Sequence, residues 1–272
     1  MHREYKYLGF LQALFICILL VVNLIGAGKV SLLTIPWLPQ SLVIPIGTGI
    51  IFFPLSYLLG DLLTEVYGYH ASRRVIWTGF GALIVANLMV QVILHMPASP
   101  DWHLQKAYED IFSISWRITV ASIIAFAAGE FANSYVMAKM KLFTKGSKLW
   151  ARTIGSTICG EALDTLVFYP LAFLGSADFS LTLIGQIMLS NYVGKVAWEV
   201  LATPLTYLVV GWLKKAENED YYDSKTDFNP FHLNASPSDN GFRSSEFELQ
   251  NQTIVRRATS TKAQGDEAIS LN

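Results

Sequence analysis

One stretch of the sequence combines membrane-like hydrophobicity with acidic side chains. Residues 152–170, RTIGSTICGEALDTLVFYP, are typical of a membrane-crossing helix, yet Glu161 and Asp164 lie near its middle. A carboxylate at bilayer depth costs at least about 2.5–3.5 kcal/mol on insertion scales, so it must face a partner or a wet cavity. A spacing of three residues places both acids on one helix face. The helix is therefore predicted to line a polar interior.

Other charged and amide side chains fall within or beside further apolar stretches. Lys195 and Arg152 are the basic candidates at similar depth, so they cannot neutralise all the acids. The remaining acids are expected to be protonated, hydrated, or available to a ligand rich in hydrogen-bond donors. The predicted substrate-binding residues are Asp61, Glu65, Glu130, Asn133, Arg152, Glu161, Asp164, Asn191, Lys195 and Glu199.

A carboxylate suits a guanine-like edge, where a ring N–H and an amino N–H donate side by side into its two oxygens. A second acid could pair with an aminomethyl cation on such a ligand. Tyr57, Tyr169 or Trp198 could stack on the ring. These residues are compatible with such a ligand but do not demand it.

Structural roles are open for several of these residues. Lys195 and Glu199 are four residues apart on one helix and could simply neutralise each other. Asn133 and Asn191 could provide hydrogen bonds between helices, which is the commoner use of such side chains in membranes. These alternatives compete with a ligand-binding role.

Asp61 and Glu65 lie near a helix end, where they could be solvated or pair with Arg73 and Arg74. Asp61 and Asp164 could also form the catalytic pair of an intramembrane aspartyl hydrolase. Against that hypothesis, Asp61 lacks the preceding Gly-x of the G-x-G-D pattern. In addition, such a pair must share one proton across a short distance.

The composition indicates a membrane protein. The chain has 272 residues, of which 52% are hydrophobic and 15% charged, and its mean hydropathy is +0.38. This predicts an all-α, polytopic membrane protein with six transmembrane helices. The sixth stretch is long for one crossing and is expected to tilt or to be interrupted near Gly194 or Pro204. The six predicted spans are 7–27, 42–63, 77–94, 115–138, 152–175 and 181–213, and residues 31–40 are expected to form a loop.

Charge is distributed unevenly along the chain. Up to residue 215 there are 15 Lys and Arg against 11 Asp and Glu, whereas from residue 216 onward there are 5 against 10. Most of the basic groups fall on one side of a six-helix arrangement, so the positive-inside rule places both termini in the cytoplasm. Residues 1–215 are predicted to form the transmembrane domain, and residues 216–272 a polar, acidic and disordered tail.

The sequence has no G-x-x-x-x-G-K-[ST] loop and no zinc-binding spacing. No ATPase or metal chemistry is therefore expected of this chain itself. No cofactor is expected, and the expected partners are a small molecule and the lipid bilayer rather than a nucleic acid.

Four ordered segments resemble the queuosine precursor transporter family, also called the vitamin uptake transporter family. They are GDLLTEVYGY (60–69), GEFANSYVMAKMK (129–141), RTIGSTICGEALDTLVFYPLAF (152–173) and KVAWEVLATPLTY (195–207). The resemblance implies a six-helix carrier of the inner membrane, not an enzyme. It would import 7-deazaguanine bases such as preQ0 or preQ1, with queuine or queuosine as alternative substrates.

The family is distantly similar to the substrate-binding subunits of energy-coupling-factor vitamin importers. The resemblance therefore leaves open a second function, that of a binding subunit that needs a separate ATPase module. The acidic tail lies outside the family pattern.

Overall fold

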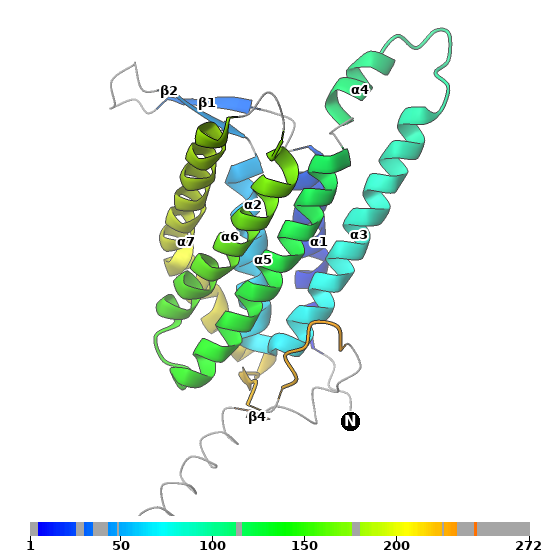
Figure 1. Cartoon of the computed structure of the whole chain (residues 1–272). Helices are drawn as coiled ribbons and strands as arrows, with labels where there is room; N and C mark the ends of the chain where they lie inside the picture. Colours follow the sequence, from blue (N-terminus) through cyan, green and yellow to red (C-terminus); the bar gives the residue numbers. More distant parts are fainter. Residues whose placement is uncertain are drawn as a thin grey trace, which may run out of the picture.

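The computed structural model is a bundle of long helices (Figure 1). It describes residues 5–25, 30–34, 43–47, 49–112, 116–175, 180–224, 226–232 and 242–243. The long helices are α1 (Leu8–Leu24), α2 (Gly49–Tyr67), α3 (Tyr69–His95), α5 (Trp116–Phe143), α6 (Leu149–Phe173) and α7 (Leu181–Glu217), and α4 (Gln105–Phe112) is short.

The two ends of the bundle differ (Figure 1). One end carries α4 on one side and a hairpin of β1 (Val30–Thr34) and β2 (Val43–Gly47) on the other, and we call it the strand end. At the opposite end α2 meets α3, α5 meets α6, and α7 ends. We call this the basic end because it gathers Arg73, Arg74, Lys141, Lys145, Lys148, Lys214 and Lys215.

The bundle buries charged side chains beside its apolar core and exposes many large apolar side chains, which is unusual for a water-soluble protein. Large apolar side chains on the outer faces are more than half exposed, as at Leu88 of α3 and Leu201 of α7, whereas acids on α2, α5 and α6 are fully buried. An exposed apolar surface of this extent fits contact with lipid. The exterior therefore supports a membrane location.

Three stretches are long and apolar enough to cross a membrane by length and composition, namely Tyr69–His95, Gln105–Phe143 and Ile184–Glu217. The helix α1 is apolar but shorter. The helices α2 and α6 are not among these stretches, and they are the helices that carry Asp61, Glu65, Glu161 and Asp164. In α2 and α6 the polar residues that lower the hydropathy of the helix lie in the core of the bundle and not on its exterior.

The helices α5 and α6 approach closely at two glycines, Gly129 and Gly160. A Cβ atom added at Gly160 would lie 2.9 Å from the Gly129 carbonyl oxygen and 2.9 Å from the Asn133 Cβ. Small residues allow such an approach between membrane helices. This contact brings the polar faces of the two helices together.

The connection between α2 and α3 is a single residue, Gly68, with φ +83°. This left-handed conformation favours glycine. A Cβ atom at Gly68 would also lie 2.2 Å from the Tyr221 ring, so the glycine makes room for a residue from the end of the chain.

Three expectations from the sequence need correction. Part of the expected loop 31–40 is strand β1, which pairs antiparallel with β2 from Val30↔Gly47 to Thr34↔Val43. Its Val, Leu and Thr residues favour extended structure. The second helix consequently begins at Gly49 instead of residue 42. The helix α7 runs unbroken for 37 residues with Pro204 inside it, so the interruption expected near Gly194 or Pro204 is wrong, whereas the alternative of a tilted helix stays a prediction.

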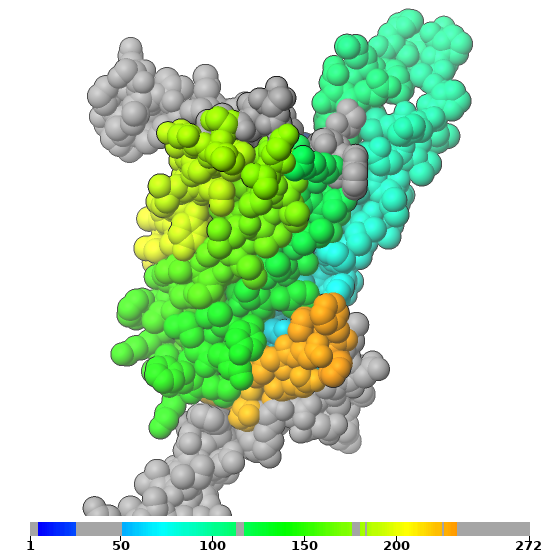
Figure 2. All heavy atoms as spheres, viewed as in Figure 1, coloured from blue at the N-terminus to red at the C-terminus, as the bar shows by residue number. Residues whose placement is uncertain are grey.

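The chain after α7 is also more ordered at its start than expected of a disordered tail. We call residues 218–224 and 226–232 the C-terminal segment, which contains β3 (Tyr221–Tyr222) paired with β4 (Phe242–Arg243). The segment packs on the basic end, where Tyr221, Tyr222 and Asp223 are buried. Figure 2 shows residues near 230, in orange, lying against the bundle. Residues 233–241 and 244–272 of the predicted tail lie outside the described residues.

Hydrogen bonds fix this segment to α3. Arg73 donates to the backbone carbonyls of Asp227 and Asn229, and Trp77 donates to that of Pro230 at 2.7 Å. Burial raises the pKa of the Asp223 carboxyl, although this carboxyl accepts hydrogen bonds from the Tyr69 backbone N–H and from Thr226. Arg73 is thus engaged with the C-terminal segment and not with the acids of α2.

We predict that Gly160→Ala destabilises the folded protein by about 1–3 kcal/mol, because the added methyl group forces α5 and α6 apart. Gly185→Ala is the matched control, since a Cβ atom there meets nothing within 4 Å. The measurement is thermal unfolding of both variants in detergent. Equal melting temperatures would contradict the importance of this contact.

Candidate substrate site

Acidic side chains from α2, α5, α6 and α7 gather inside the bundle. Each is at most 8% exposed. The acids on α6 are three residues apart and share one face, as the sequence predicts. We call the set the central acids: Asp61, Glu130, Glu161, Asp164 and Glu199.

One lysine joins the two acids of α6. The Lys195 Nζ atom donates to the Glu161 Oε2 atom at 2.7 Å and to the Asp164 Oδ2 atom at 3.0 Å. The same ammonium lies 4.6 Å from the centre of the Phe53 ring, a cation–π contact. Lys195 therefore pairs across helices with α6, and the expected alternative of a Lys195–Glu199 pair on α7 is wrong.

Asp61 is half satisfied. Its Oδ1 atom accepts hydrogen bonds from Asn133 at 2.8 Å and from Ser156 at 3.4 Å. Within the described part of the chain its Oδ2 atom has no hydrogen-bond partner. Asn133 thus links α5 to α2, so it makes the interhelical hydrogen bond that the sequence left open.

Glu130 and Glu199 are buried without hydrogen-bond partners. Neither oxygen of either carboxyl has a partner among the described residues, and the same is true of the Tyr57 hydroxyl. Glu199 lies close enough to Asp61 and Glu161 for mutual electrostatic repulsion. A buried polar group left unpaired costs about 1–3 kcal/mol, and a charged one more. Such groups are available for a proton or a ligand.

Access to the central acids requires the helices to move apart. Glu130 is 0% exposed and Glu161 1% exposed, so a ligand cannot reach them in this closed arrangement. The side chain of Asp164 is 11% exposed, and the side chain of Lys195, which pairs with it, is 13% exposed. Entry to this site would therefore pass by Lys195.

Glu65 belongs to a separate set of charges toward the basic end. Its carboxylate accepts from Arg152 at 2.7 Å and from Lys214 at 2.6 Å, and Lys141 lies 3.7 Å away. Asp220 of the C-terminal segment pairs with Lys141 and Lys214 at 2.5 and 2.8 Å. We call these five residues the Glu65 cluster.

This cluster changes the role of two predicted site residues. The sequence placed Arg152 at the depth of Glu161 and Asp164, but its guanidinium pairs with Glu65 and also donates to Thr144. Glu65 is fully buried rather than solvated, and Arg152, not Arg73 or Arg74, is its arginine partner. Both residues fasten helices together and stand apart from the central acids.

Sequence reasoning missed three members of this cluster. Lys141 falls between the predicted spans 115–138 and 152–175, but it lies in α5, is 1% exposed, and also donates to the backbone carbonyls of Glu65 and Tyr221. Lys214 directly follows the last predicted span, and Asp220 falls in the predicted tail. Pairing between distant helices leaves no local signal that could have found them.

Asn191 lies one turn before Lys195 on α7. Its amide donates to the Tyr169 hydroxyl at 2.5 Å. Tyr169 is one of the aromatic residues that the sequence suggested for stacking, and it is 9% exposed. The two residues join α6 and α7 beside the acids and extend the polar face toward the strand end.

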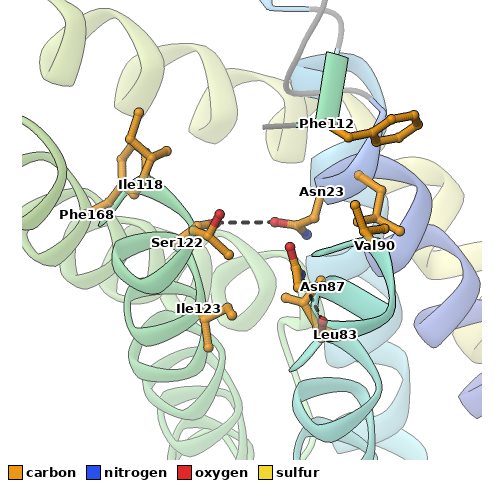
Figure 3. Close-up of a pocket in the computed structure, with 11 residues that line it drawn as sticks. Asn23, Leu83, Asn87, Val90, Phe112, Ile118, Ser122, Ile123 and Phe168 are labelled. Atoms are coloured by element: carbon orange, nitrogen blue, oxygen red, sulfur yellow. Dashed lines mark hydrogen bonds between the residues drawn. The ribbon is translucent and has the colours of Figure 1, made fainter. Parts of the chain in front are cut away.

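A small cavity lies between α1, α3 and α5 (Figure 3). It holds about 100 Å³ and is lined by Asn23, Asn87 and Ser122 among mostly apolar residues. Ser122 donates to the Asn23 Oδ1 atom at 3.2 Å. Ligand pockets commonly measure about 300–1,000 Å³, so this cavity suits water better than a base. None of the predicted site residues lines it.

A larger apolar groove of about 630 Å³ lies between α1, α2 and α7, lined by residues such as Phe10 and Trp212. Both of these side chains are more than half exposed. No group of three or more His, Cys, Asp or Glu residues in the described ranges could hold a metal ion.

A family model described as "Putative vitamin uptake transporter" matches residues 47–209. The match covers more than half of the chain and includes all the central acids. The chain belongs to the vitamin uptake transporter family. Family membership confirms the resemblance seen in the four sequence segments and makes the protein a transporter, not an enzyme. Family membership therefore contradicts the hydrolase hypothesis for Asp61 and Asp164.

Relatives in the family carry more specific names. The chain is 32% identical over 161 residues to the "Probable queuosine precursor transporter" of Bacillus subtilis, covering 58% of this chain and 69% of that protein. It is 30% identical over 149 residues to the "Queuosine precursor transporter" of Escherichia coli, covering 54% of this chain and 65% of that protein. The alignments thus span about two thirds of these relatives. No solved structure matches the chain.

The first prediction from the site concerns stability. Glu65→Gln leaves three cations with one fewer anion in a buried place, and breaking a buried pair costs about 3–5 kcal/mol. Thermal unfolding in detergent should show a large drop in melting temperature. Glu109→Gln, the same change at an exposed acid of α4, should have little effect. A normal melting temperature for Glu65→Gln would contradict a fastening role.

The second prediction concerns the C-terminal segment. Although burial raises the pKa of Asp220, Lys141 and Lys214 hold it below its ordinary value, so the ion pairs persist at neutral pH and weaken only as the pH falls through that lowered pKa. Asp220→Asn removes the charge at neutral pH and should make residues 218–232 cleavable by protease several-fold faster. Unchanged cleavage would show that other contacts hold the segment.

Proposed function

We propose that this protein imports 7-deazaguanine precursors of queuosine, such as preQ0 or preQ1, across the cytoplasmic (inner) membrane as a multi-pass carrier. Family membership and the names of its relatives support this proposal. The observation that carries it for this chain is the pair of acids, Glu161 and Asp164, held by a single lysine in the core of a bundle with an apolar exterior. Queuine and queuosine are alternative substrates of the same chemistry.

The ligand would exchange with Lys195. A deazaguanine presents a ring N–H and an amino N–H side by side, which match the two oxygens of one carboxylate. The other acid of the pair could accept from an aminomethyl cation, as in preQ1. A ligand that supplies these donors replaces the hydrogen bonds that Lys195 now makes, so neither acid is left unpaired on binding.

Neighbouring groups would hold the rest of the base. Tyr169, positioned by its hydrogen bond with Asn191, and Tyr57, whose hydroxyl has no partner among the described residues, would flank the acids from α6 and α2. Aromatic faces stack well on flat heterocycles. Asp61, Asn133 and Glu199 lie deeper in the same polar interior and complete the proposed site.

The long helices would provide six crossings, with both termini in the cytoplasm. The basic end would face the cytoplasm by the positive-inside rule. The strand end would then face outward, and substrate would pass from the strand end to the basic end. The C-terminal segment would lie on the cytoplasmic surface.

The second candidate is a binding subunit of an energy-coupling-factor type importer. The exposed apolar groove between α1, α2 and α7 favours this candidate, because it offers a membrane-embedded partner a concave surface. Reconstitution of this chain alone separates the two functions. A solitary carrier takes up labelled preQ0 without any other protein, whereas a binding subunit binds preQ0 but transports none.

We expect Asp164→Asn and Glu161→Gln each to abolish uptake while the protein remains folded in the membrane. Removing one charged partner of a buried hydrogen-bonded pair costs about 2–5 kcal/mol, so Kd for preQ1 should rise by at least roughly 30-fold. Uptake and binding are measured on purified protein in vesicles, with Glu109→Gln as the control. Normal transport by both variants would show that the site lies elsewhere.

Function in cells is tested by rescue. The chain is expressed in a bacterium unable to make preQ0 and lacking its own transporter, with a limiting external supply of precursor. Queuosine in tRNA should be restored by the wild-type chain and not by Asp164→Asn. Absence of queuosine with the wild-type chain would contradict the proposed substrates.

A further inference from the structure

Glu130 is the most completely isolated acid of the site. Its side chain is 0% exposed, and neither carboxyl oxygen has a hydrogen-bond partner in the part of the chain that the structure describes. The carboxyl lies against the backbone of α2, since a Cβ atom added at Gly60 would lie 2.0 Å from the Glu130 Oε1 atom. The absent side chain at position 60 therefore creates the space that Glu130 fills.

The charges around Glu130 come from three packed helices. From α2 it faces Tyr57 and Asp61, and from α6 it faces Glu161 and Asp164. Among the described residues, Lys195 of α7 is the cation that forms ion pairs with these acids. It already pairs with both acids of α6. Of the titratable groups on α3 near the basic end, His70 and Arg73 contact each other, and Arg73 also binds the C-terminal segment.

These neighbours decide the protonation state of Glu130 in the closed bundle. Five central acids and one lysine would carry a net charge of −4 if all were ionised. An ionised carboxylate without water, donor or cation costs several kcal/mol, which is more than the cost of binding a proton near neutral pH. Glu130 is 0% exposed to solvent and, among the described residues, has neither a hydrogen-bond donor nor a cation paired with it, so it is protonated when the bundle is closed.

Opening the bundle reverses this condition. Once the helices separate, water reaches the carboxyl, which then has the pKa range of an ordinary solvated acid and releases its proton. The closed and open states thus differ in proton binding at Glu130. A group of this kind links a conformational change to a proton.

We propose that Glu130 carries a proton across the membrane together with the deazaguanine, so that import is driven by the proton gradient. This inference rests on the proposed function. As the loaded bundle closes at the outer, strand end, the Glu130 carboxylate takes a proton from a hydronium ion, whose O–H bond breaks as the O–H bond of the acid forms, leaving water. At the basic end the O–H bond breaks and the proton returns to water, with no other reactant consumed.

Occupancy of the site couples the proton to the ligand. A bound base fills the space beside Glu161 and Asp164 and excludes water, so the loaded bundle closes only with Glu130 protonated. When the base has left, water fills its space and hydrates the Glu130 carboxylate, so the empty carrier returns without the proton in a hydrated arrangement that differs from the closed bundle described above. Each cycle therefore moves one proton in the direction of the ligand.

The test uses the full-length protein in sealed vesicles and preQ0, a neutral base that carries no charge of its own. The readout is the ratio of preQ0 taken up with an inward gradient of one pH unit to that taken up at equal pH, on the same vesicles. One coupled proton sustains about a tenfold ratio for one pH unit. We expect the wild type to approach this ratio and Glu130→Gln, which cannot exchange a proton, to give a ratio near one.

Glu109→Gln is the matched control and should keep the wild-type ratio, because Glu109 is exposed on α4. A Glu130→Gln ratio equal to that of the wild type would overturn the proposal. A second measurement needs no variant: a trapped pH-sensitive dye should report acidification of the vesicle interior when preQ0 enters through the wild-type protein. Entry of preQ0 without acidification would also overturn it.

These outcomes are distinct from a failure of the proposed function. If wild-type vesicles take up no more preQ0 than protein-free vesicles under any gradient, the substrate assignment fails. If they take up preQ0 equally well with and without the gradient, the substrate assignment stands and the proton coupling fails.

Discussion

The structure depends on the neutralisation of buried charge by a small number of cations. Lys195 forms ion pairs with two acids of α6. Lys141, Lys214 and Arg152 pair with Glu65, and the two lysines also pair with Asp220. In a low-dielectric interior each of these pairings decides which helices must lie side by side. The outside of the bundle imposes no such condition, since lipid contacts any apolar face equally well.

The two groups of charges differ in their ratio of cations to anions. This difference distinguishes the group that holds the helices together from the group proposed to bind substrate. In the Glu65 cluster three cations meet two anions, every charge has a partner, and the helices are held together by short contacts. Among the central acids one cation meets five anions, and several carboxyl oxygens have no partner within the described residues. A saturated cluster is stable as it stands, whereas an unsaturated one gains by binding a proton or a ligand with donors. That contrast is the reason for placing the transport chemistry at the central acids.

The C-terminal segment shows how chain outside the family match adapts to the bundle. The family model ends at residue 209, but Asp220 completes the Glu65 cluster and Tyr221 packs where Gly68 leaves room. The segment contacts α2, α3 and α5 at the basic end. Any opening of this end must therefore loosen ion pairs with Lys141 and Lys214 as well as separate helices.

The sequence by itself determined the helical class, the membrane-like composition and the polar face of α6. These features follow from local composition and from the helical period, which places Glu161 and Asp164 on one face whatever surrounds them. It also determined the family, because four ordered motifs can be recognised without knowledge of their contacts. It predicted that acids would outnumber cations, which is a matter of counting.

Only the tertiary structure decided which cation each acid receives. Arg152 and Lys195 read as equivalent partners in the sequence, yet rotation and depth of their helices send one to Glu65 and the other to Glu161 and Asp164. In the sequence Lys141 and Asp220 resemble solvated charges. In the structure helix packing buries Lys141, and the C-terminal segment folds back so that Asp220 pairs with this lysine. Ion pairs between helices depend on distances across the bundle, and the spacing of residues along one chain does not contain those distances.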